Sequence, residues 1–304
     1  MLEIKRILVP TDLSPSATAA FQVARDVAIR FDAEIHVLHV RTESARIPGI
    51  SKLLGEQPEE GGSAAYEQQV QQELEAYLGG FQPSAAVQRD GTRPATEILG
   101  YAESAGVDLI VIGTHGHRSL EHPALGGTAG DVVRKATSPV LTVRIGEEDA
   151  GSFQGFRRVV AAVDFAEHSD EIVRAAKELA RRFEAKLSLI FVAEEHRVPI
   201  FSDTGMISVT TLKLDDEIVS RSNAALRQLD GNTGPSIAGT EYELRRGNPA
   251  REIVDYADDP DGDLIVLGRR GHSVHEGLLL GTVTEHVVRR SKTPVLTIGL
   301  AEPT

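Results

Sequence analysis

Short apolar runs alternate with amphipathic stretches along the chain, and this alternation predicts strands that alternate with helices. Residues 7–9 form an apolar run, and the segment 16–31 then places alanines and valines on one helical stripe. Further strands are predicted at 35–40, 85–89, 107–112 and 140–143, and further helices at 63–78, 94–103 and 131–136. This order is typical of an α/β fold with a five-stranded parallel sheet and helices on both faces.

The second half of the chain repeats the first. Residues 6–40 align with 158–192 at an offset of 152 residues, which sets Asp12 on Asp164. Residues 108–144 align with 263–299 at an offset of 155, with 17 of 37 positions identical. A period of about 150 residues is the size of a domain rather than of a solenoid unit. We therefore expect two tandem Rossmann-like domains at 1–147 and 157–304, joined by a polar, Gly-rich linker at 148–156.

Composition narrows the range of partners. Hydrophobic residues make up 41% of the 304 positions and charged residues 25%, so each half can bury a core. A net charge of −13, only 5% aromatic residues and no Trp argue against nucleic acid or an anionic membrane as the partner. The absence of Cys excludes thiolate catalysis and Cys-ligated zinc. Without a signal-peptide pattern or a long apolar span, we expect a cytoplasmic protein.

A glycine-rich motif follows the fourth predicted strand of the second half, with the pattern G-x2-G-x9-G-T. It comprises Gly268, Arg269, Arg270, Gly271, His272, Gly281 and Thr282. Glycines let a backbone approach a ligand closely, and the start of the following helix offers N–H groups and a dipole to an anion. The two arginines and the histidine add positive charge. A Gly-rich turn without a ligand is the alternative, but the position between a buried strand and a helix favours phosphate binding.

The order of a strand, an Asp loop and a late Gly loop resembles the universal stress protein family, over nearly the whole chain, twice. The residues that carry the resemblance are VPTDLS at 9–14, AVDFAEHS at 162–169, GTHGH at 113–117, GRRGH at 268–272, SPVLTV at 138–143 and TPVLTI at 293–298. The motif spacing is typical of the ATP-binding branch of that family. The resemblance implies an adenine nucleotide alpha hydrolase-like fold, a role in the stress response and ATP as ligand.

The resemblance also implies roles for single residues. The aspartate after the first strand contacts the nucleoside in that family, which points to Asp12 and Asp164, although such an aspartate also caps turns and helices. The end of the second strand lies beside adenine, which points to Val40 and Val192, although a core valine is an equally good interpretation. The implied second-half site comprises Val163, Asp164, Val192, Gly268, Arg269, Arg270, Gly271, His272, Gly281, Thr282 and Val283.

The first half departs from the motif. Gly127 stands at the hydroxyl position, Thr128 comes one residue late, and Thr114 and His115 replace the two arginines. Gly130 falls in the expected helix and weakens it by about 1 kcal/mol relative to Ala. The implied first-half site comprises Thr11, Asp12, Val40, Gly113, Gly116, His117, Gly126, Gly127 and Thr128. We expect the second half to bind ATP better.

These residues favour a regulatory nucleotide-binding module that is at most a slow ATPase, because signatures of adenylating enzymes are absent and no catalytic residues stand out. Mg²⁺ is expected to arrive with the phosphates of ATP, and His115, His117 and His122 are not expected to form a dedicated metal site. The alternative is a stress protein that binds a lipid or another small molecule, or a scaffold for partners. Fold alone does not decide between these functions.

Two further expectations concern assembly and the insertions. The family dimerises through its last strands, which implies an intrachain pseudo-dimer between residues 139–144 and 294–298, or a homodimer. Apolar strands of this kind promote aggregation when they lie unpaired at the edge of a sheet. The segments 41–62 and 194–211 are long and dissimilar between the halves, so they are lids, partner surfaces or tolerated insertions.

Overall fold

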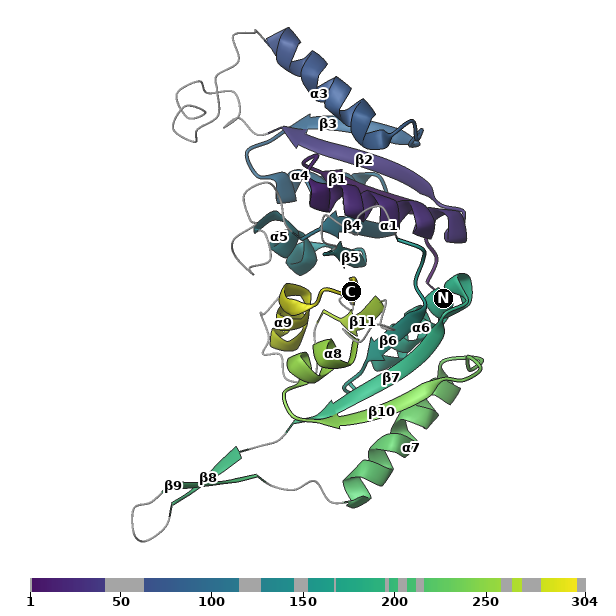
Figure 1. Cartoon of the computed structure of the whole chain (residues 1–304), viewed down its shortest axis with the longest axis vertical. Helices are drawn as coiled ribbons and strands as arrows, with labels where there is room; N and C mark the ends of the chain where they lie inside the picture. Colours follow the sequence, from purple (N-terminus) through teal and green to yellow (C-terminus); the bar gives the residue numbers. More distant parts are fainter. Residues whose placement is uncertain are drawn as a thin grey trace. The chain divides into compact units, whose positions relative to one another are not determined.

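The computed structural model divides the chain into two compact domains, Glu3–Gly155 and Phe156–Glu302, each of which is described by itself below. The residues that the structure describes are 2–41, 63–114, 127–144, 153–166, 168–194, 197–201, 207–211, 216–257, 264–269 and 280–299. Figure 1 shows the elements and their labels.

The first domain is a parallel five-stranded sheet in the order β3-β2-β1-β4-β5 (Figure 1). Its strands are β1 (Arg6–Thr11), β2 (Glu34–Arg41), β3 (Ala85–Asp90), β4 (Leu109–Gly113) and β5 (Val140–Val143). Its helices are α1 (Pro15–Phe31), α3 (Ser63–Leu78), α4 (Pro94–Ser104) and α5 (Gly127–Lys135). The strand order reverses between β1 and β4. With right-handed crossovers, α1 and α3 therefore cover one face of the sheet and α4 and α5 the other.

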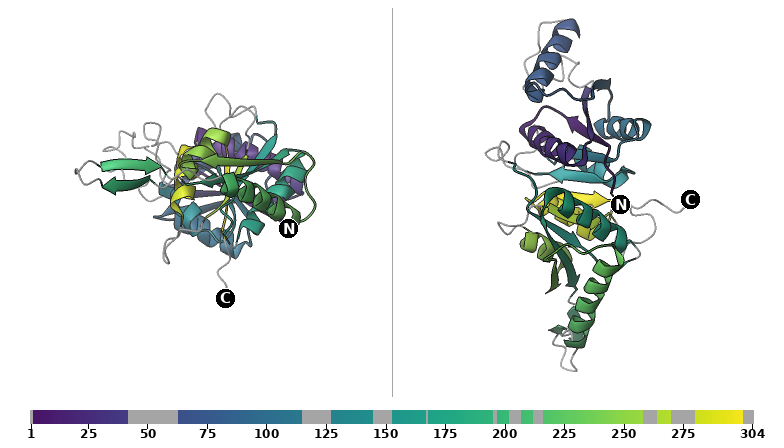
Figure 2. Two further views of the ribbon diagram at one scale, coloured as in Figure 1. Left: turned by 90° about the horizontal axis from the view of Figure 1, so that it is seen from below. Right: turned by 90° about the vertical axis from the view of Figure 1, so that its right-hand side faces the viewer.

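The second domain repeats this topology in the order β10-β7-β6-β11-β12. Its strands are β6 (Arg158–Ala162), β7 (Lys186–Ala193), β10 (Glu241–Arg246), β11 (Leu264–Gly268) and β12 (Val295–Ile298). Its helices are α6 (Ser169–Phe183), α7 (Asp216–Asn232), α8 (Pro249–Ala257) and α9 (Thr282–Arg290). Figure 2 shows helices packed against the sheet of each domain. The predicted α/β fold is confirmed in both halves.

Local chemistry explains where α1 begins and where the first helix of each domain ends. Ser14 caps α1, since its hydroxyl accepts a hydrogen bond from the Ala17 N–H at 3.3 Å, and Pro15 occupies the first turn. Both α1 and α6 end at a residue in the left-handed conformation, Asp32 with φ 55° and Glu184 with φ 54°. The same stop at matched positions indicates that the two helices end by one mechanism.

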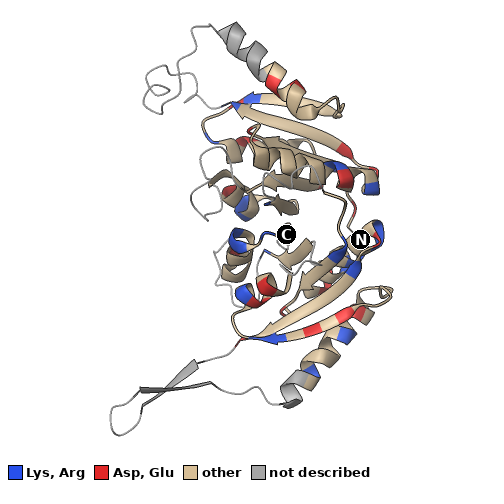
Figure 3. Ribbon diagram, viewed as in Figure 1, with Lys and Arg blue, Asp and Glu red and all other residues tan. Residues whose placement is uncertain are grey.

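Charge is absent from the last two strands of each domain. Figure 3 shows charged residues on the helices and on other strands, whereas β4, β5, β11 and β12 carry none. All residues of β5, β11 and β12 are buried, and so are four of the five residues of β4. Such uninterrupted apolar runs are typical of strands with both faces covered. They place the core of each domain around β4 or β11.

One described element was not predicted. The segment after β7 contains an antiparallel hairpin of β8 (Arg197–Phe201) and β9 (Ile207–Thr211), which forms a small separate sheet. The sequence predicted only a long insertion there. The corresponding first-domain segment, 42–62, lies outside the described residues.

Candidate functional site

The candidate site of the second domain lies at the carboxyl ends of β6 and β11, where the strand order reverses. The two strands pair in parallel, with Val266 opposite Ala161, and this register continued places Gly268 beside Val163. Val163 is buried, and its N–H donates to the carbonyl oxygen of Ile190 in β7 at 3.0 Å. Ligands of open parallel sheets bind at such switch points. The fold thus brings the Asp loop and the Gly motif to one edge.

Asp164 forms a tight turn directly after β6. Its Oδ1 accepts a hydrogen bond from the Ala166 N–H at 3.1 Å, so the carboxylate has a turn-forming role. Phe165, between them, has a φ of 58°, which non-glycine residues rarely adopt. The side chain of Asp164 is only partly buried, so its role in the turn does not exclude a contact with a nucleoside.

The two ends of the G-x2-G-x9-G-T motif are hydrogen-bonded to each other. The Gly281 N–H donates to the Arg269 carbonyl oxygen at 2.8 Å, and the Thr284 hydroxyl donates to the Gly268 carbonyl oxygen at 2.7 Å. Gly281 is the N-cap of α9, and Thr282, the first helical residue, is exposed. Val283 is half-buried. The end of β11 and the start of α9 are therefore held together. An anion site at a helix N-terminus requires a helix start that is fixed in this way.

Arg269 is buried beside the end of β12. Its backbone N–H donates to the Ile298 carbonyl oxygen at 2.9 Å, and a methyl group added at Gly299 would overlap its guanidinium group. The first domain reverses this pair, with Thr114 at the matching position after β4 and Arg144 after β5. Each domain thus keeps one arginine at the ends of these two strands. Arg270, Gly271 and His272 lie outside the described residues.

The candidate site of the first domain has the same framework with different side chains. The Thr11 hydroxyl accepts from the Leu13 N–H at 2.9 Å, and Asp12 Oδ1 accepts from the Ser14 N–H at 3.1 Å. Gly127 begins α5 and is exposed, while Thr128 is half-buried. Gly116, His117 and Gly126 lie outside the described residues, as do His115 and His122.

Gly113 has a packing reason that sequence reasoning did not give. A Cβ added there would lie 2.7 Å from the carbonyl oxygen of Ser16, in the first turn of α1. The absence of a side chain therefore lets α1 approach the end of β4.

Tyr77 is a residue of the first-domain site that sequence reasoning missed. Its hydroxyl donates to the Ala17 carbonyl oxygen at 2.9 Å and lies close to Thr11 and Asp12. Burial raises the pKa of Tyr77 far above its ordinary value, so the hydroxyl stays protonated. Its ring packs on Phe21, with centroids 5.1 Å apart. A tyrosine from α3 therefore reaches the Asp loop of this domain.

Val40 and Val192 occupy the strand ends as expected. Val40 is half-buried and pairs with Arg89, and Val192 is buried and pairs with Arg245. Within the described part of the chain, no group of three or more His, Cys, Asp or Glu side chains is placed to hold a metal ion. In the same part, no helix is long and apolar enough to cross a membrane.

The fold and the paired loops define an α/β protein with two repeated domains, each with a candidate site at the carboxyl edge of its sheet. The chain belongs to the universal stress protein family, whose family model matches residues 3–144 and 155–299. It is 30% identical over 146 residues to the universal stress protein YxiE of Bacillus subtilis, covering 47% of this chain and 99% of that one. It is 34% identical over 144 residues to the universal stress protein MJ0531 of Methanocaldococcus jannaschii, covering 47% and 82%.

A solved structure matches the chain over nearly its full length. This is a universal stress protein from Archaeoglobus fulgidus, with a TM-score of 0.67 at 20% identity, covering 98% of this chain and 97% of that one. At this identity the similarity supports the fold alone. It indicates that a solved protein of the family shares the fold over both halves of the chain.

Proposed function

We propose that the protein is an ATP-binding regulatory module of the stress response, acts in the cytoplasm and is at most a slow ATPase. The observation that carries this proposal is the hydrogen bond between the Gly281 N–H and the Arg269 carbonyl oxygen, 2.8 Å long. It holds the two ends of the phosphate-binding motif together at the edge that also carries Asp164. Family membership supports the same interpretation.

The proposed binding mode assigns one part of the nucleotide to each element. Asp164 and the end of β7 at Val192 face the nucleoside. The motif from Gly268 to Thr282 and the first turn of α9 hold the phosphates through backbone N–H groups and the helix dipole. Mg²⁺ enters with the phosphates, since it is usually bound through substrate oxygens and water.

The two domains are proposed to bind with unequal affinity. The second domain has the Thr284 hydroxyl bond where the first has Ala129, and its arginine, Arg269, lies within the glycine motif, whereas Arg144 follows β5. In the first domain Tyr77 also lies against the Asp loop. We therefore propose a tighter ATP site in the second domain.

Calorimetric titration with Mg-ATP tests both ATP binding and the unequal affinity of the two domains. The same substitution, to glutamate, is made at one of two matched positions. Thr282 and Gly127 are each exposed at the first position of a helix, α9 or α5. A glutamate there suits the helix dipole but repels phosphate. Thr282→Glu is expected to weaken the tighter site about tenfold or more, because like charges in contact cost several kcal/mol. Gly127→Glu is expected to leave that site unchanged.

Three outcomes would contradict the proposal. Wild-type protein that fails to bind millimolar Mg-ATP would exclude the ATP function. Equal affinity at both sites would exclude the proposed inequality. A lipid, rather than an adenine nucleotide, in the mass spectrum of a denatured extract of the purified protein would favour a carrier instead.

A further inference from the structure

Two phenylalanines, one exposed and one half-buried, form an aromatic pair at the carboxyl edge of the second domain. Phe165 comes three residues after the end of β6, and Phe191 lies near the end of β7. These two strands are neighbours in the sheet (Figure 1). Their ring centroids are 4.7 Å apart, with an angle of 47° between the planes. Phe165 is 37% exposed, and among the described residues only Ile29 is another large hydrophobic side chain with such exposure. This exposed ring is therefore free to pack against a ligand bound at the candidate site.

The backbone conformation of Phe165 is energetically unfavourable for a residue with a side chain. Its φ of 58° lies in the left-handed region, where a side chain crowds the following carbonyl group. The matching residue of the first domain, Leu13, has a φ of 63°. Both turns are closed by an aspartate that accepts a hydrogen bond from the N–H two residues later. Both domains thus place an apolar residue in the left-handed position of this turn, and strained backbone of this kind clusters at functional sites.

The register of the sheet relates this pair to the phosphate-binding motif. The Val163 N–H donates to Ile190 in β7 at 3.0 Å, so Phe191 lies on one side of the end of β6. Gly268 at the end of β11 lies on the other side. The distance from β7 to β11 is two strand spacings, about 10 Å. Asp164 lies between the aromatic pair and the glycine motif, at the place where the sugar of a bound nucleotide would join base and phosphates.

We propose that Phe165, supported by Phe191, is the surface on which the base of the bound nucleotide stacks. This inference rests on the proposed ATP function of the same site. A flat heterocyclic base covers an exposed phenyl ring, and stacking of this kind tolerates any base because every base has a π-face. The first domain has Leu13 and His39 at the matching positions, so it offers no such pair. The stacking surface therefore adds to the expected preference of ATP for the second domain.

A fluorescence experiment tests the contact directly. The chain contains no Trp, so Phe165→Trp introduces a single indole while keeping a large aromatic ring. Mg-ATP is expected to quench its emission by stacking, whereas magnesium tripolyphosphate, which lacks a base, is expected not to. Leu13→Trp is the matched comparison, and its emission is expected to change only at higher Mg-ATP concentrations, because the first domain is proposed to bind ATP less tightly. Emission of Phe165→Trp that is unchanged at saturating Mg-ATP would overturn the proposal.

Affinity measurements separate this inference from the function on which it rests. Phe165→Leu places the first-domain residue in the same left-handed turn, so the fold of the loop is expected to remain. It is expected to weaken Mg-ATP binding about tenfold and to leave the affinity for tripolyphosphate unchanged. If the variant binds Mg-ATP as the wild type does, the stacking surface is wrong and the ATP function stands. If the wild type does not bind Mg-ATP, both are wrong.

Discussion

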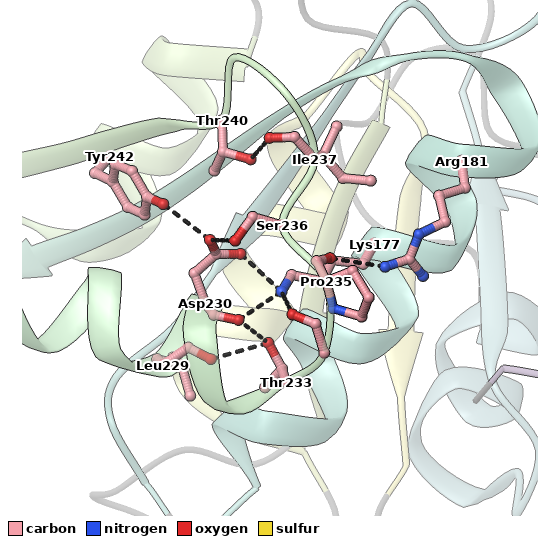
Figure 4. A network of polar contacts seen from close by, with 11 residues as sticks. Lys177, Arg181, Leu229, Asp230, Thr233, Pro235, Ser236, Ile237, Thr240 and Tyr242 are labelled. Carbon is pink, nitrogen blue, oxygen red and sulfur yellow. Dashed lines mark hydrogen bonds and ion pairs between the residues drawn. The ribbon is translucent and has the colours of Figure 1, made fainter.

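A lysine and an aspartate form a buried ion pair inside the second domain, between α6 and α7. Lys177 Nζ lies 2.8 Å from Asp230 Oδ1, and the side chains are 0% and 2% exposed. The Lys177 ammonium also donates to the carbonyl oxygens of Asp230 and Gly234, and the second carboxylate oxygen accepts from Ser236 and Tyr242 (Figure 4). The network ties the end of α7 and the following loop to α6.

Removal of the lysine is expected to be strongly destabilising. Lys177→Met leaves the Asp230 carboxylate buried without its cation, which costs about 3–5 kcal/mol. Lys177→Met combined with Asp230→Asn removes both charges and keeps an acceptor for the two hydroxyl groups, so it is expected to cost less. Urea unfolding of wild type and variants measures both. A double variant that is less stable than Lys177→Met would contradict this account.

The same pair predicts a pH dependence. Burial alone would raise the pKa of Asp230, but hydrogen bonds from Lys177, Ser236 and Tyr242 together outweigh burial and hold it below its ordinary value. The folded pKa is then lower than the unfolded pKa of about 3.9, so the stabilisation is complete above that pH and is lost as the pH falls through the folded pKa. Asp230→Asn is expected to lose less stability than wild type on acidification below about pH 4.

Single residues show what the sequence could and could not predict. The spacing of Val173, Ala176, Lys177 and Ala180 places the lysine on the apolar stripe of α6, which is a signal that a buried partner is needed. The partner, Asp230, is 53 residues away in a part of the chain that the repeat does not align. Tyr77 also lies outside the aligned blocks, and its contact with the Asp loop depends on tertiary packing. Contacts of this kind cannot be derived from local pattern.

The junction between α1 and β4 supports a prediction that compares two glycines of one domain. Gly113→Ala would bring a methyl group to 2.7 Å from the Ser16 carbonyl oxygen, so α1 must shift, at a cost of about 1–3 kcal/mol. Gly100→Ala, in α4, meets no atom within 4 Å and removes a flexible residue from a helix, which stabilises by roughly 0.5–1 kcal/mol. Thermal unfolding of both variants measures the difference. A melting temperature that is not lowered in Gly113→Ala would contradict the packing role.

Most helices and strands were predictable because pattern and packing agree. The apolar runs became the buried strands, and the stripe of α1 faces the sheet, with Phe21, Val23 and Val27 buried. The strand expected to begin at Val107 begins at Leu109, because Asp108 instead accepts hydrogen bonds from the Lys5 and Arg6 N–H groups. The β8–β9 hairpin was missed because its insertion has no counterpart in the aligned part of the first half.

The duplication explains how one chain holds two different edges on the same topology. The strand order and the left-handed residues after the aspartates are shared, so they belong to the framework. Thr114 after β4, Arg269 after β11, the aromatic pair and Tyr77 differ between the domains, so the proposal of unequal ATP affinity rests on these residues. The sequence could predict the shared framework from the repeat itself, whereas the differences become interpretable only once neighbouring strands are known.

The outermost strands β5 and β12 support the last prediction. Each is the last strand of its own sheet order and carries no charged residue to protect an edge. We propose that they pair within one chain as a pseudo-dimer. Hydrogen exchange is then expected to be slow at every amide of Val140–Val143 and Val295–Ile298, and light scattering is expected to give one chain of 32.7 kDa. Rapid exchange at alternate amides would indicate free edges, and a doubled mass with full protection would indicate pairing between chains instead.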